Sequence, residues 1–180
     1  QINDLKIYIS LNNLFSLNNA KINNLTLIKS NINLNKNNYD FFYQLLNQNL
    51  EDLNLTIKDS YIFYRNSDDQ VLFINKVKNM NYYYNIKESK NVLETENEIF
   101  NLPYSFISSK KKNEKKIFSK LNLDFFRLKV ENNFDYNNDI KKGFLNFIFN
   151  NIKSNMTYEI NKENLLLNFS EKGKKSNFSY

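Results

Sequence analysis

The chain of 180 residues contains no cysteine and no histidine, and only two glycines and one proline. The absence of cysteine excludes disulfides and thiolate-ligated metals, and the absence of histidine removes the commonest metal ligand and general base. Catalysis by Ser–His or Cys–His pairs is therefore excluded. Neither absence identifies a cellular compartment. We expect no metal, no cofactor and no enzymatic activity.

Long apolar runs are also missing. Even a stretch such as residues 145–149, which includes Asn146, falls far short of the ~20 residues that a membrane-spanning helix needs. The chain begins at Gln1 without an initiator methionine or a signal-like leader. We therefore expect residues 1–180 to be a single β-rich domain, cut from a longer protein, with any membrane anchor outside it.

Hydrophobic residues make up 41% of the chain and aromatic residues 16%, which is enough to fold a domain. Asparagine is abundant, at 37 residues, but its companions Lys, Ile, Phe and Tyr also have AT-rich codons, so we assign it no function. The net charge of +6 would suit an anionic partner. Much of that charge is local, because lysines crowd residues 110–116 and 172–175. Both clusters are interpreted as solvated loops.

Apolar and polar residues alternate in short segments from Leu5 to Phe178. A period of two predicts strands with one dry and one wet face, and loops about every ten residues predict a meander. In the second half, the positions predicted to line the dry face are Leu121, Leu123, Phe125, Leu128, Val130, Leu145, Phe147, Phe149, Met156, Tyr158, Ile160, Leu165, Leu167 and Phe169.

An internal repeat lies near the start of the chain. The residues Leu25, Leu27, Ser30, Ile32 and Leu34 recur thirty positions later as Leu55, Ile57, Ser60, Ile62 and Tyr64. A two-residue turn at Asp59–Ser60 would place Ile57 opposite Ile62, so each copy is predicted to be a hairpin with one apolar side.

One short helix is predicted between the two copies of the repeat. Asn38 is a suitable N-cap, and the aromatic and aliphatic residues that follow it at helical spacing are Tyr39, Phe42, Tyr43 and Leu46. We interpret this helix as a plug or lid packed on the end of the sheet.

Two architectures bury a dry face of this kind. The strands can close into a sandwich or barrel filled by their own side chains, or one twisted sheet can curl into a trough that stays open. A sandwich usually needs frequent glycine and proline at its tight corners. Their scarcity favours a mainly β fold in which a long twisted antiparallel meander curls into an open groove.

Three segments resemble AsmA-like proteins of Gram-negative bacteria. They are KIFSKLNLDFFRLKVENN from Lys116, EIFNLPY from Glu98, and the pattern LxIxDSxIxY from Leu55. The resemblance extends from about Leu25 onward. It implies a periplasmic β-groove segment that is anchored to the inner membrane by a helix outside this chain and passes phospholipid toward the outer membrane. The implied partner is a phospholipid or other acyl-chain lipid, with no nucleic acid and no catalytic residues.

Other functions make different demands on the sequence. An enzyme would have to rely on groups such as Glu94, Glu96 and Glu98, which in a strand share one face and are better interpreted as solvated decoration. A β-solenoid or adhesin-like structural module would explain the thirty-residue repeat, although solenoids need at least three units and two are visible. Nucleic-acid binding would need aromatic residues among the lysines, whereas residues 82–84 lie apart from them.

Overall fold

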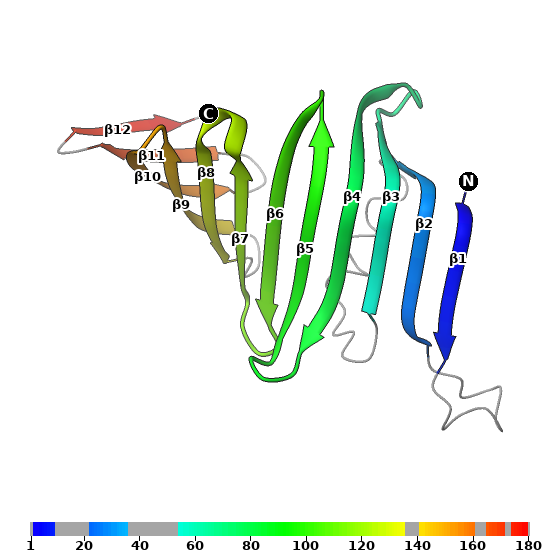
Figure 1. Ribbon diagram of the computed structural model, residues 1–180. Coiled ribbons are helices and arrows are strands. Elements are labelled where there is room, and N and C mark those ends of the chain that lie inside the picture. Colours follow the sequence, from blue (N-terminus) through cyan, green and yellow to red (C-terminus); the bar gives the residue numbers. More distant parts are fainter. Residues whose placement is uncertain are drawn as a thin grey trace.

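The computed structural model describes residues 2–9, 22–35, 54–135, 141–160, 165–171 and 174–179. These ranges form twelve strands in a single sheet, and their order in the sheet is their order in the chain (Figure 1). The strands are β1 (Ile2–Ile9), β2 (Ile22–Leu34), β3 (Asn54–Arg65), β4 (Val71–Asn85), β5 (Lys90–Ile99), β6 (Leu102–Lys111), β7 (Lys116–Leu123), β8 (Leu128–Asp135), β9 (Lys141–Phe149), β10 (Ile152–Ile160), β11 (Leu165–Glu171) and β12 (Lys174–Ser179).

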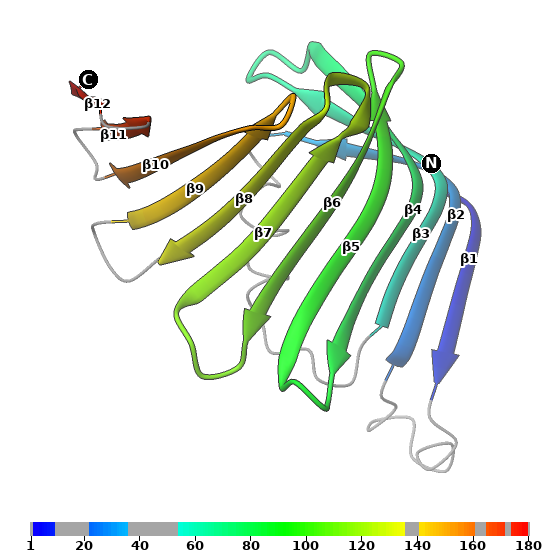
Figure 2. The same ribbon diagram turned by 60° about the vertical axis from the view of Figure 1, so that its left-hand side comes forward.

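The sheet is open, with β1 at one end and β12 at the other. Each described strand packs mainly against its sheet neighbours, and no second layer of described strands lies on either face (Figures 1 and 2). The strands rotate steadily along the sheet, as the right-handed twist of L-residue strands requires. The predicted fold, a mainly β, twisted and open meander, is confirmed. The predicted helix from Asn38 lies outside the described residues.

The hairpin predicted for each copy of the repeat is wrong. Each copy is one strand, and β2 and β3 pair in parallel, so that Leu27 lies beside Ile57 and Ile32 beside Ile62. A hairpin would need Asp59 and Ser60 to reverse the chain, but β3 runs through both residues as one strand from Asn54 to Arg65, although Asp59 has φ 47°. All other neighbouring strands pair antiparallel, so the repeat supplies the one exception in the described sheet.

A bend crosses β2, β3 and β4 at one level. Lys29 in β2 has φ 51°, Asp59 in β3 has φ 47°, and the register of β4 shifts between Val77 and Asn79. The shift leaves Lys78 as an extra residue in β4, and an extra residue of this kind bends a strand and increases its twist. The bend of β2 is visible in Figure 2. Just beyond it, Ser30 and Ser60 are fully buried, and the Ser30 N–H donates to Ser60 Oγ at 3.0 Å.

Asparagine takes the place of glycine in the tight turns. The two-residue turns between β5 and β6 and between β9 and β10 consist of Phe100–Asn101 and Asn150–Asn151, and all four residues have positive φ. Asparagine tolerates this conformation better than most residues, because its short amide bonds the local backbone. Part of the asparagine content therefore has a structural role that the composition did not reveal.

The structure also changes the predicted strand ends. β7 ends at Leu123, and Asp124–Phe126 form a 3₁₀ turn, η3, closed by Arg127 at φ 48°. Phe125, predicted to share a strand face with Leu123, therefore lies in this turn. Of the first lysine cluster, only residues 112–115 form an exposed loop, whereas Lys110 and Lys111 belong to β6 and Lys116 to β7. In the second cluster, Lys174 and Lys175 belong to β12.

Candidate functional site

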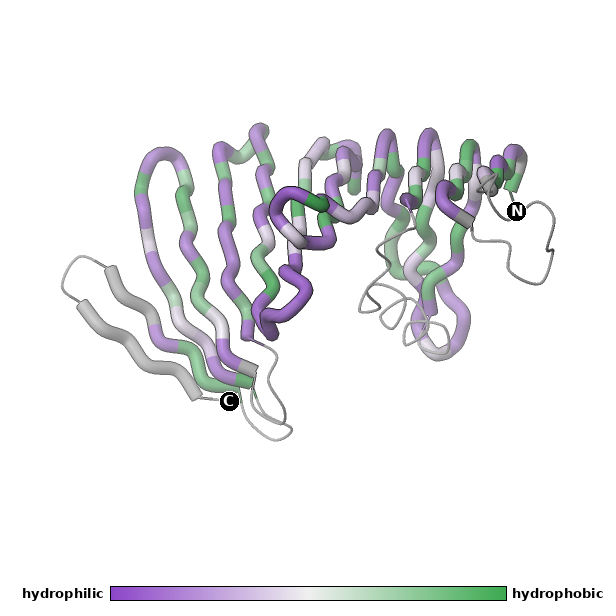
Figure 3. The backbone as a smooth tube through the Cα atoms, turned by 90° about the horizontal axis from the view of Figure 1, so that it is seen from below, coloured by the Kyte–Doolittle hydropathy of each residue, from purple (hydrophilic) through white to green (hydrophobic). Residues whose placement is uncertain are grey.

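The strand register assigns every side chain in the sheet to one of two faces, because residues directly opposite each other project to the same side. Figure 3 shows the resulting alternation of apolar and polar residues along the strands. One row of register partners crosses ten strands: Leu5, Leu27, Ile57, Met80, Thr95, Phe106, Leu121, Val130, Phe147 and Ser154. We call the side that carries this row the apolar face.

The row runs across the strands, along the length of the sheet. Steps of about 4.8 Å between neighbouring strands give it a contour length of roughly 40 Å. Only Thr95 and Ser154 are polar, and each is small. The row is therefore a nearly continuous line of apolar residues, longer than the ~30 Å hydrocarbon core of a bilayer. Ile57 and Thr95 are buried, Leu5 is exposed and the other row residues are half-buried.

Every predicted lining position except Phe125 belongs to the apolar face by register. These positions are Leu121, Leu123, Leu128, Val130, Leu145, Phe147, Phe149, Met156, Tyr158, Ile160, Leu165, Leu167 and Phe169. Most of the described side chains among them are half-buried, and Phe149 is 55% exposed. Phe125 is 72% exposed and makes an edge-to-face contact with Phe126 in the turn.

Aromatic rings close over the single described glycine of this face. Phe134, Gly143 and Tyr158 are register partners on β8, β9 and β10. The rings of Phe134 and Tyr158 stack at 6.2 Å between centroids, and a Cβ at Gly143 would overlap the Tyr158 ring. The Tyr158 hydroxyl donates to Asn132 Oδ1 at 3.1 Å. Burial raises the pKa of Tyr158, partly offset by this hydrogen bond, so the polar tip is satisfied without interrupting the aromatic surface.

A buried polar cluster interrupts the apolar face at β4–β6. The Tyr104 hydroxyl donates to Asn75 Oδ1 at 3.1 Å and accepts from Asn97 Nδ2 at 3.0 Å, and Thr95 Oγ1 donates to Asn97 Oδ1 at 2.6 Å. Burial raises the pKa of Tyr104, while its bonds to the two asparagines oppose that rise. Asn75 and Asn97 are each only 3% exposed. The cluster thus pairs its own polar groups and leaves the surrounding face dry.

Tyr82 and Asn91 also belong to this face but lack such pairing. Both are 5% exposed, and the Tyr82 hydroxyl and Asn91 Oδ1 have no hydrogen-bond partner among the described residues. Burial alone raises the pKa of Tyr82. An unpaired buried hydroxyl destabilises the fold, so these two groups are weak points of the central strands.

The sequence-based list missed the first half of the apolar face. Leu25, Leu27, Ile57, Met80 and Phe106 continue the predicted surface through β2–β6. The repeat already carried the signal, since both copies have one apolar side. If each copy is interpreted as a separate hairpin, however, neither copy extends the predicted surface of the second half. No sequence signal predicted the polar cluster.

The opposite side, which we call the polar face, carries cross-strand charge pairs. Lys120 Nζ lies 2.8 Å from Glu131 Oε1, and Lys142 Nζ lies 3.0 Å from Glu159 Oε2. Glu94, Glu96 and Glu98 share this face, as predicted. Both pairs keep access to solvent, and such pairs contribute only about 0–1 kcal/mol each. Their main effect is therefore to favour the correct register, because a slip by one residue would exchange the two faces.

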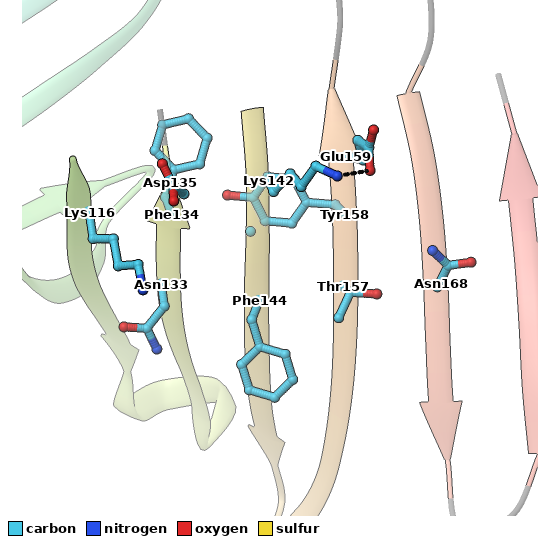
Figure 4. A pocket seen from close by; sticks show the side chains of 11 residues that line it. Lys116, Asn133, Phe134, Asp135, Lys142, Phe144, Thr157, Tyr158, Glu159 and Asn168 are labelled. Carbon is cyan, nitrogen blue, oxygen red and sulfur yellow. Dashed lines mark ion pairs between the residues drawn. The ribbon is translucent and has the colours of Figure 1, made fainter. Parts of the chain in front are cut away.

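A hollow of about 460 Å³ lies over β7–β11, lined mainly by residues of the polar face (Figure 4). Four charged residues of its lining, Lys116, Asp135, Lys142 and Glu159, are consecutive register partners with alternating sign. Opposite charges side by side largely cancel each other's field at a distance. The hollow therefore has no strong preference for an ion of either sign.

The described part of the chain contains no group of three or more acidic side chains placed to share a metal ion. Within the same ranges, no helix has the length and hydropathy of a membrane span. Comparison of the chain with protein-family models, curated proteins and solved structures gives no significant match.

Proposed function

We propose that the apolar face binds the acyl chains of phospholipid or another acyl-chain lipid, and that the protein is a β-groove segment that passes such lipids between two membranes. The observation that carries this proposal is the row of register partners from Leu5 to Ser154. It crosses ten strands of an open sheet, and no described strand covers it. Most side chains of the row are only half-buried, and a partly open apolar surface of this extent is typical of an interaction site.

The energetics favour long chains as the occupant. Each acyl methylene moved from water to an apolar surface gains about 0.8 kcal/mol when fully buried. The row is longer than an extended acyl chain, since two leaflets of such chains together span the ~30 Å bilayer core. A chain lying along the row would therefore find apolar contact over most of its length, except beside Thr95 and Ser154.

The same geometry suggests how a lipid moves. Neighbouring residues of the row are similar in chemistry and about 4.8 Å apart, so a displaced chain exchanges one apolar contact for an equivalent one. The charged headgroup stays in water beside the sheet, where its hydration is kept. No bond is made or broken, and the proposal requires neither an enzyme nor a cofactor.

The resemblance to AsmA-like proteins supplies the cellular setting of the proposal. In that setting the segment lies in the periplasm, is anchored to the inner membrane by a part of the protein outside this chain, and carries phospholipid to the outer membrane. The apolar face is the feature of the molecule that supports this setting, and the anchored full-length protein is the form in which to test it.

Two phenylalanines of β9 provide a matched test of lipid binding. Phe147 belongs to the apolar face and Phe144 to the polar face. A carboxylate in contact with acyl chains loses several kcal/mol of hydration. We therefore expect Phe147→Glu to reduce co-purifying lipid at least tenfold, and Phe144→Glu to leave it nearly unchanged, when organic extracts of the purified proteins are analysed by mass spectrometry.

Circular dichroism and thermal unfolding identify variants that remain folded, and only these are compared. Wild-type protein without bound lipid, also after incubation with phospholipid vesicles, would contradict the proposal and favour a structural or adhesin-like module. Equal lipid loss from the two folded variants would show that lipid does not lie on the apolar face.

A further inference from the structure

Strand β1 leaves one edge of the sheet unpaired among the described strands. Its apolar side chains are unusually open, with Leu5 52%, Ile7 47% and Tyr8 53% exposed. Natural edge strands are normally protected by prolines, bulges, coverage or several charges, because a bare edge pairs with other strands. β1 has no proline, its central charges are one aspartate and one lysine, and its one register shift lies at its end, between Tyr8 and Ile9. Such an edge is suited to pairing with another strand.

We propose that β1 pairs antiparallel with β1 of a second copy of this chain, with Leu5 facing Leu5 on the two-fold axis. In this register Asp4 of each copy lies opposite Lys6 of the other, which gives two ion pairs related by symmetry. Asp4 and Lys6 are both exposed and belong to the polar face. The strand is thus complementary to itself in both charge and apolar contact.

Charge selects this register over its neighbours. Faces match only when the pairing shifts by two residues at a time. A shift in one direction centres the pair on Asp4 and opposes two aspartates, and a shift in the other direction centres it on Lys6 and opposes two lysines. Like charges directly opposite each other destabilise strand pairing. Only the register centred on Leu5 pairs each charge with its opposite.

The dimer would extend the sheet and keep the apolar faces of both copies on the same side. Residues directly opposite each other in an antiparallel pair share a face, so Leu5 on the apolar face of one copy adjoins Leu5 on the apolar face of the other. The two apolar faces then form one continuous surface of twice the length. The inference concerns the edge of the sheet and does not depend on what binds to its face.

Sedimentation and light scattering of the purified chain test the association. A dimer has twice the 21.6 kDa mass of the chain. Lys6→Asp and Asp4→Lys each place like charges opposite each other in a homodimer, and we expect each to weaken association at least tenfold. Mixed in equal amounts, the two variants regain complementary charges, because both charged positions of β1 are acidic in the first variant and basic in the second. Recovery of dimer in the mixture also shows that both variants are folded.

Disulfide trapping tests the geometry directly, since the chain has no cysteine of its own. Paired Cα atoms at the two-fold lie about 4.5–5.5 Å apart, within disulfide range, so Leu5→Cys should form a covalent dimer under mild oxidation. Tyr8→Cys is the control, because the two copies of residue 8 would lie about 20 Å apart. A chain that stays monomeric, a dimer unaffected by Lys6→Asp, or equal trapping at both positions would overturn the inference.

Discussion

Gly143→Ala should destabilise the fold through one identified contact. The added Cβ overlaps the ring of Tyr158, so the ring must move away from Phe134 and from Asn132. Loss of the hydrogen bond to Asn132 costs about 1 kcal/mol, and loss of the stacking costs about 0.5–1.5 kcal/mol. Replacing a strand glycine by alanine returns about 0.5–1 kcal/mol. We therefore expect the free energy of unfolding to fall by about 1 kcal/mol.

A double-mutant cycle in urea isolates this effect. In the Tyr158→Ala background the ring is gone, so Gly143→Ala should be neutral or stabilising by up to about 1 kcal/mol. The coupling energy between the two positions should be about 1.5–2.5 kcal/mol, the sum of the hydrogen-bond and stacking terms. If Gly143→Ala has the same effect in both backgrounds, Tyr158 does not cover Gly143 and the reasoning is refuted.

Three further predictions concern turns and buried hydroxyls. Phe100→Asn should raise the free energy of unfolding by about 1 kcal/mol, because Phe100 is 76% exposed at φ 50° and asparagine accepts that conformation. A lower free energy of unfolding in urea would contradict the positive φ assigned to this turn. Tyr82→Phe removes an unpaired buried hydroxyl and should be neutral or stabilising, whereas Tyr104→Phe removes a paired one and should cost about 1–2 kcal/mol; thermal melts in the reverse order would contradict this. Burial raises the pKa of Tyr104 above 10.0, so the folded state favours the neutral hydroxyl. This contribution to stability is complete below the unfolded-state pKa and is lost as the pH rises through the raised folded-state pKa. Tyr104→Phe should therefore make the alkaline fall in stability shallower, and an unchanged pH profile would rule out this contribution.

Much of the architecture followed from the alternation of apolar and polar residues. Because the side-chain period of a strand is two, Leu121 and Phe147 could be assigned to one face without knowing which strands were neighbours. The scarcity of glycine and proline correctly favoured an open sheet over a sandwich. The predicted lining positions share a face for this reason, and their contact with lipid stays a prediction.

The remaining features depend on backbone conformation and pairing, which the alternation does not encode. β3 bends at Asp59, which has positive φ, but does not reverse there, and the two copies of the repeat pair in parallel. Arg127 closes a turn that takes Phe125 out of its strand. The polar cluster around Tyr104 joins residues up to 29 positions apart, so no local pattern predicts it.

The most direct test of the account is photo-crosslinking from phenylalanine positions on the two faces. Phe106 and Phe147 belong to the long row of the apolar face, and Phe118 and Phe144 belong to the polar face. Each is replaced in turn by the photoreactive analogue p-benzoylphenylalanine, and the protein is irradiated with phospholipid and analysed by mass spectrometry. Lipid adducts at the two apolar-face positions and not at the two polar-face positions are predicted. Equal labelling of both faces, or labelling of the polar face alone, would contradict the claim that the apolar face holds acyl chains.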